Sequence, residues 1–100
     1  MSFSRHLNED SRMRIQNIAN GIRSTPAYSS FQVRSQLYDI HSGAYAIEIS
    51  KDGRIVNLFL FYPGMNGKIE SIAIYGSNLH GHISAIRSSM NIFGMKVESV

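Results

Sequence analysis

A tight reversal in the middle of the chain, Lys51-Asp52-Gly53-Arg54, constrains the fold more than any other feature of the sequence. Asp-Gly supplies the two residues with positive φ that a type I′ turn requires, and such a turn joins two antiparallel strands. Residues 44–50 alternate in polarity before the turn, and an apolar stretch over 55–61 follows it. The sequence therefore predicts a β-hairpin at the centre of the domain.

The two-residue turn also predicts which side chains share a face of the hairpin. It pairs Lys51 with Arg54, and an unbroken ladder then keeps every second residue of both strands on one side. The side expected beneath the helices carries Tyr45, Ile47, Ile49, Val56, Leu58 and Leu60. The opposite side carries Ile55, Phe59 and Phe61 beside small alanines, rimmed by Glu48, Asn57 and Ser50. We expect this second side to be an exposed apolar patch.

The N-terminal third predicts an amphipathic helix. Asn8 is a favourable N-cap, and Glu9 and Asp10 place negative charge where the helix dipole favours it. Apolar residues then recur at helical spacing at Ile15, Ile18 and Ile22. Pro26 disfavours helical geometry at the residue before it, so the helix should end by that point.

The remaining elements are predicted with different clarity. Residues 31–41 fit either a strand with a break in its alternation near 35–37 or one face of a helix, and we favour the strand. Residues 68–75 predict a fourth strand. An apolar stripe over 79–93 predicts a second helix, and residues 95–100 alternate as a short last strand.

Together these elements predict an α+β domain in the order α-β-β-β-β-α-β, with a mostly antiparallel sheet of four to five strands. Both helices should pack on one face of that sheet. A strand-helix-strand connection is usually a right-handed crossover between parallel strands, so the last strand should lie parallel to the fourth. A chain of 100 residues provides one core, and we expect residues 1–100 to form a single domain.

Several kinds of chemistry are disfavoured. The chain has no cysteine, which excludes disulfides and thiolate sites and fits a reducing compartment. It shows neither a signal-peptide core nor a membrane-spanning apolar run, so we expect a cytoplasmic protein without membrane contact. His80 and His82 form the only close histidine pair, and we expect surface histidines there instead of metal ligands. No nucleophile elbow or phosphate-binding loop occurs, so neither enzymatic activity nor a cofactor is expected.

Positive charge is concentrated in the first 34 residues, which hold five arginines against two acids. Arg12, Arg14 and Arg23 on the first helix offer contacts to phosphates, and Phe59 with Phe61 would offer a stacking surface for bases. The simpler interpretation of these arginines is a solvated helix face.

Two functions follow from these observations. The first is a small non-enzymatic protein-binding module of the inhibitor, immunity or adaptor type, which occludes a larger partner, alone or as a homodimer. Its contact residues would be Ile55, Phe59 and Phe61 with Arg12, Arg14 and Arg23. The alternative is a small nucleic-acid-binding regulator that uses the basic helix. A competing expectation for the apolar patch is that the N-terminal segment, or Tyr28 and Phe31, folds over it within the chain.

Overall fold

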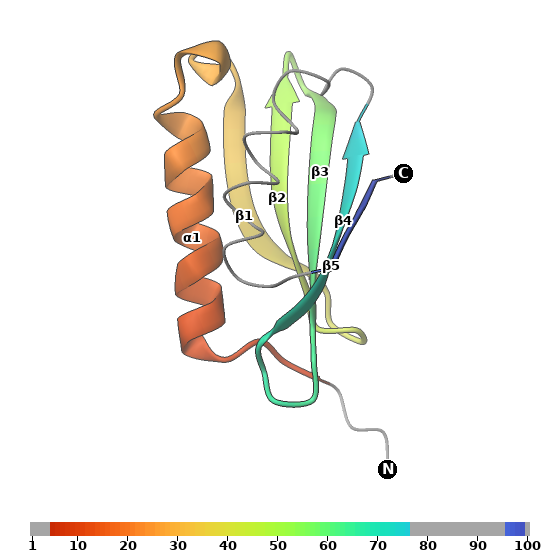
Figure 1. Ribbon diagram of the computed structural model, residues 1–100. Coiled ribbons are helices and arrows are strands. Elements are labelled where there is room, and N and C mark those ends of the chain that lie inside the picture. Colours follow the sequence, from red (N-terminus) through yellow and green to blue (C-terminus); the bar gives the residue numbers. More distant parts are fainter. Residues whose placement is uncertain (1–4, 77–95, 100) are drawn as a thin grey trace.

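The computed structural model describes residues 5–76 and 96–99 of the chain (Figure 1). A helix, α1 (Glu9–Arg23), and one short 3-10 turn, η1 (Pro26–Tyr28), precede the sheet. The strands follow one another across it in sequence order: β1 (Gln32–Asp39), β2 (Ala44–Lys51), β3 (Arg54–Pro63), β4 (Ile69–Gly76) and β5 (Lys96–Ser99). β1 to β4 pair antiparallel and β5 pairs in parallel with β4. The α+β class and the four-stranded antiparallel sheet are as expected.

Helix α1 begins as its sequence predicts. The Asn8 side chain accepts a hydrogen bond from the backbone N–H of Ser11 at 2.8 Å, which satisfies one of the free donors of the first turn. Ile15, Ala19 and Ile22 are buried on the side that faces the sheet. The helix runs alongside β1 in Figure 1 and makes its main contacts with that strand.

The central hairpin has the predicted turn. Asp52 and Gly53 have φ values of 52° and 77°, as a type I′ turn requires, and Lys51 lies opposite Arg54. The ladder is nevertheless interrupted two residues later, because Ser50 lies opposite Ile55 whereas its neighbour Ile49 lies opposite Asn57. Val56 is thus an extra residue in β3, a β-bulge.

This bulge makes the predicted faces of β3 wrong. An extra residue moves every later side chain to the other side of the sheet, so Phe59 lies beside Ile47 and Phe61 beside Tyr45. Both phenylalanines are 0% exposed in the main core. That core also includes the helix residues and Tyr28, with Phe31 packed against it, so these two phenylalanines are covered within the chain on the side of α1. Leu58 and Leu60 take the opposite side.

The segment before the hairpin is a strand, as favoured by its sequence. β1 carries a bulge of its own between Leu37 and Asp39, one step beyond the predicted break in alternation. Its outer edge is partly blocked, because the Arg23 guanidinium donates two hydrogen bonds to the carbonyl oxygen of Val33, at 3.2 and 2.8 Å. This side chain therefore occupies a backbone acceptor that an added strand would use.

The N-terminal segment is held against two turns at one end of the sheet. Asn8 donates its backbone N–H to the carbonyl oxygen of Gly67 at 2.8 Å. Gly43 has a φ of 73° and lies against the backbone of Arg5. A Cβ atom at position 43 would overlap the carbonyl oxygen of Arg5. These contacts fix where α1 starts relative to the strands.

The predicted second helix over 79–93, together with His80 and His82, lies outside the described residues. Within the part of the chain that the structure describes, no helix is long and apolar enough to cross a membrane.

A candidate binding face on the sheet

The sheet face opposite α1 has an apolar centre of its own. Ala46, Leu60 and Ala73 lie side by side across β2, β3 and β4, and all three are buried. Leu58 and Tyr62 pack against them and are half-buried. Small alanines on both sides of a leucine leave the middle of this face low, while larger side chains rise around it.

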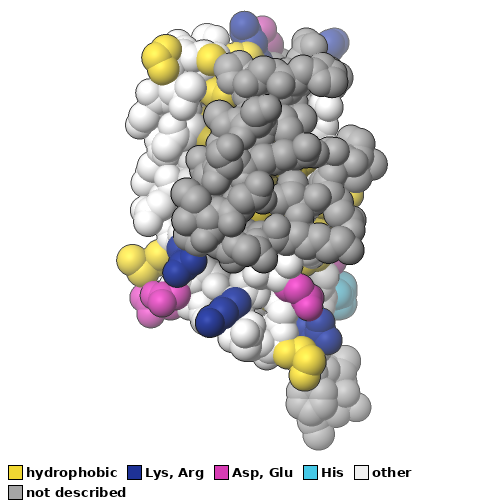
Figure 2. Space-filling view, in the orientation of Figure 1, with side chains coloured by type: hydrophobic (Ala, Val, Ile, Leu, Met, Phe, Trp, Pro, Cys, Tyr) yellow, Lys and Arg dark blue, Asp and Glu magenta, His cyan; other side chains and the backbone are white. Residues whose placement is uncertain are grey.

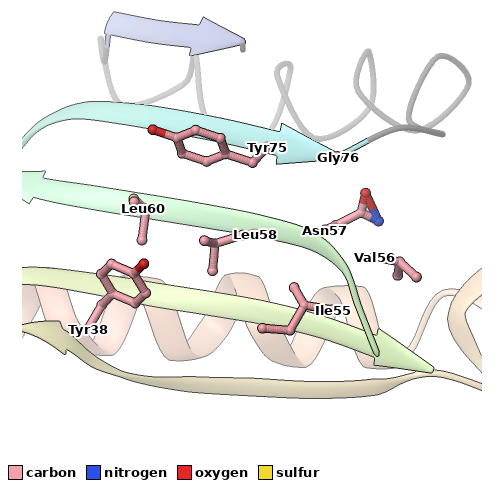
Figure 3. Close-up of a pocket in the computed structure, with 8 residues that line it drawn as sticks. All are labelled: Tyr38, Ile55, Val56, Asn57, Leu58, Leu60, Tyr75 and Gly76. Atoms are coloured by element: carbon pink, nitrogen blue, oxygen red, sulfur yellow. The ribbon is translucent and has the colours of Figure 1, made fainter. Parts of the chain in front are cut away.

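A hollow of about 440 Å³ opens on this face (Figure 3). Tyr38 from β1 and Tyr75 from β4 stand on either side of Leu60, and they are 53% and 38% exposed. Ile55, next to the hairpin turn, is 57% exposed. We call this hollow the tyrosine trough; its lining residues are Tyr38, Ile55, Val56, Asn57, Leu58, Leu60, Tyr75 and Gly76.

The chemistry of the trough is apolar and uncharged. Its lining, as far as the structure describes it, includes no Lys, Arg, His, Asp or Glu. Burial raises the pKa of the nearby Tyr62 hydroxyl, and Tyr75, Tyr38 and Asp39 raise that pKa further. The trough therefore lacks a group that could act as a base at neutral pH or hold a phosphate.

One lining residue is polar and buried. Asn57 is 6% exposed, and its Oδ1 accepts no hydrogen bond from the described residues. It lies opposite Gly76, at the end of the trough near the bulge. A buried amide oxygen without a donor lowers the stability of the fold at this point.

Polar side chains border the face on the β1 side. Arg34 and Glu48 are neighbours across β1 and β2, yet they form no ion pair within the described chain. The Glu48 carboxylate instead accepts a hydrogen bond from the Gln36 amide at 3.3 Å. The Arg34 guanidinium is exposed and remains available for an external contact.

A second hollow, of about 430 Å³, lies beside Tyr62 at the other end of the sheet. Here Arg5 and Glu70 approach each other to 3.9 Å, both largely exposed. The Ser42 hydroxyl donates to Asp39 at 2.8 Å and accepts from the Ala44 N–H at 3.3 Å. That hydrogen bond and those from two backbone N–H groups lower the pKa of Asp39. Because Ser42 is bonded to Asp39 and not to a histidine, this cluster stabilises a turn and does not form a nucleophilic site.

The structure does not gather the predicted arginines into one surface. Arg12 and Arg14 are two positions apart on α1, which places them on opposite flanks of its buried stripe. The Arg23 guanidinium is engaged by Val33 and by the Asn20 side chain at 2.6 Å. Figure 2 shows that the basic side chains visible among the described residues are separated, with acidic ones beside several of them.

Of the predicted contact residues on the sheet, only Ile55 reaches the candidate face. Phe59 and Phe61 belong to the core, and the residues that replace them, Leu58 and Tyr75, were not predicted. The sequence of the fourth strand could have indicated Tyr75 as a surface residue. Side chains alternate along a strand, so Tyr75 lies on the face of the sheet away from Ile72 and Ile74.

Comparisons with known protein families, with characterised proteins and with solved structures find no match to this chain. Among the residues described, no three His, Asp or Glu side chains are grouped so that they could hold a metal ion. Any function must therefore be inferred from the chemistry of the exposed surfaces.

Proposed function

We propose that this chain is a non-enzymatic protein-binding domain of the inhibitor, immunity or adaptor type, and that it binds through the tyrosine trough. The observation that supports this most is an apolar hollow bordered by two tyrosines that are 53% and 38% exposed. Aromatic side chains around a desolvated apolar centre are the usual anatomy of protein interfaces.

The composition of the trough favours a protein over other ligand classes. Nucleic acid needs cations that neutralise phosphates, and none of the described residues that line the trough is a cation. A catalysed reaction needs acid, base or nucleophilic groups arranged at the site, and the described residues of the trough offer only two phenols and one amide. Apolar and aromatic side chains of a partner protein match this lining best.

A photo-crosslinking amino acid placed at position 75 tests the proposal in the producing cell. The matched control position is Met13 on α1, which is 56% exposed and lies away from the trough. We expect covalent adducts with protein from position 75 and none from position 13. Equal adducts from both positions, or none from position 75, would contradict the proposal.

The nucleic-acid alternative is tested on the same protein. Under the proposed function, the double variant Arg12→Glu and Arg14→Glu leaves the position-75 adducts unchanged. Loss of those adducts, together with loss of salt-sensitive retention on immobilised DNA or RNA, would favour the alternative.

A further inference from the structure

β1 is an edge of the sheet, and the hairpin identifies which of its backbone groups the sheet leaves unused. Lys51 and Arg54 close a two-residue turn, so their backbone groups bond to each other. Every second residue of β2, counted back from Lys51, therefore bonds to β3, and the residues between them bond to β1. The partners of those intervening residues on β1 include Arg34 and Gln36.

The other residues of β1 point their backbone N–H and C=O groups away from the sheet: Val33, Ser35 and Leu37. Arg23 occupies the first of them, because its Nε and Nη2 donate to the carbonyl oxygen of Val33 at 3.2 and 2.8 Å. None of the described side chains is bonded to the outward groups of Ser35 or Leu37. The Leu37 side chain is also 44% exposed. The edge is thus closed at one end and open at the other.

The Arg23 guanidinium takes the place that a strand added to β1 would need. Strands bond with an N–O distance of about 2.9 Å, and Nη2 already lies at 2.8 Å from the Val33 oxygen. The Asn20 side chain accepts a third bond from Nη1 at 2.6 Å, which orients the fork. Arg23 has no carboxylate partner among the described residues. An added strand would therefore have to break charge-assisted bonds or bury a cation without a counter-ion.

We infer that Arg23 is a guard residue, which prevents the β1 edge from adding a strand, and that without it the edge pairs with β1 of a second copy. An antiparallel edge is complementary to itself. A twofold axis through Ser35, perpendicular to the sheet, brings each outward N–H to an outward C=O of the other copy. This axis sets Val33 of each copy opposite Leu37 of the other, so both guards stand in the way of the pairing.

The side chains of β1 do not oppose this pairing. The same axis sets Arg34 beside Gln36 of the other copy, so the two Arg34 side chains do not meet. It also brings the exposed Leu37 beside an apolar residue, which is a favourable cross-strand contact. The guard is therefore the feature of this edge that disfavours association. The inference does not rest on the proposed function, because the tyrosine trough lies on a face of the sheet and not at its edge.

Sedimentation equilibrium of wild type and Arg23→Ala across the micromolar range tests the inference. We expect Arg23→Ala to raise the constant for dimer formation at least ~10-fold, because two guards, each with charged hydrogen bonds, no longer have to be displaced. Arg12→Ala is the matched control, since it removes the same charge from an exposed position on α1. It should leave the equilibrium as in wild type. Circular dichroism of each variant establishes that it is folded.

Two measurements locate the contact at β1. Adding Ser35→Pro to Arg23→Ala removes an outward N–H but no bond to β2, so it should return the association to the wild-type value. Amide hydrogen exchange of Arg23→Ala needs no further substitution. The amides of Ser35 and Leu37 should become protected as the concentration rises, whereas those of Arg34 and Gln36 should be protected at every concentration.

Arg23→Ala that associates no more than wild type would overturn the inference, and α1, which runs alongside β1 in Figure 1, would then close the edge by itself. Equal association of Arg12→Ala would overturn it too. Association of Arg23→Ala that leaves the Ser35 and Leu37 amides unprotected would place the contact elsewhere and refute the pairing. The crosslinks from position 75 should be the same in Arg23→Ala, so the proposed function is tested separately.

Discussion

Replacing Phe59 with alanine tests the bulge that determines both faces of the sheet. The side chain is 0% exposed, and a buried phenylalanine removes about 150–250 Å² from water. At about 25 cal/mol per Å², that burial contributes about 4–6 kcal/mol. Measured losses for this substitution in protein cores are about 3–5 kcal/mol, a large share of the 5–15 kcal/mol that stabilises a whole domain. We expect Phe59→Ala to lose about 4 kcal/mol of unfolding free energy.

The control is the adjacent residue on the same strand. Leu58 is half-buried on the opposite face, so Leu58→Ala should cost about 1 kcal/mol. Urea unfolding followed by far-ultraviolet circular dichroism measures both losses. The midpoint should fall by about 2–3 M for the phenylalanine variant and by less than about 1 M for the leucine variant. In a hairpin without the bulge, Leu58 would be the core residue and Phe59 would lie on the other face. A larger loss of unfolding free energy for Leu58→Ala than for Phe59→Ala would therefore refute the bulge.

Three further variants test individual contacts. Asn57→Leu should raise the free energy of unfolding by about 1 kcal/mol, because it removes a buried oxygen without a donor; no gain in urea denaturation would show that the oxygen has a partner. Arg23→Lys should lose about 1 kcal/mol, because an ammonium cannot reproduce the forked bond to Val33, while Arg12→Lys on the same helix should change nothing. Asp39 has a lowered pKa, so its stabilisation is complete above the ordinary value of 3.8 and is lost as pH falls through the folded-state value; Asp39→Asn should therefore show a smaller drop in melting temperature on acidification than wild type, and an equal drop would exclude this contribution.

The features that were predicted correctly from the sequence are those determined by a few residues adjacent to one another along the chain. The Asn8 cap and the Asp52-Gly53 turn each specify a local backbone geometry, and both are present in the structure. The strand over 32–39 was favoured for its alternation and is also present. Local chemistry was therefore sufficient to place the start of α1 and the centre of the sheet.

The choice of face in β3 was wrong for a nonlocal reason. Residues 58–61 are Leu, Phe, Leu and Phe, so both sides of the strand are apolar and periodicity does not distinguish them. The space beneath α1 accepts the larger rings, and the chain reaches that arrangement through one extra residue at Val56. Only the packing of distant segments against β3 could reveal which side faces the helix. The predicted contact residues Phe59 and Phe61 were wrong for the same reason.

The bulge at Val56 separates two alternative registers of this hairpin. A ladder that continued without interruption from the Asp52-Gly53 turn would point the leucines toward the place of the helix. Reaching the native pairing from there requires β3 to slide by one residue and re-form its hydrogen bonds. Ring size, and not polarity, then selects between the two outcomes. Loss of the single codon for Val56 would make the ladder continuous with Phe59 still opposite Ile47, so the phenylalanines would keep their place and the competing register would become the one that needs a bulge.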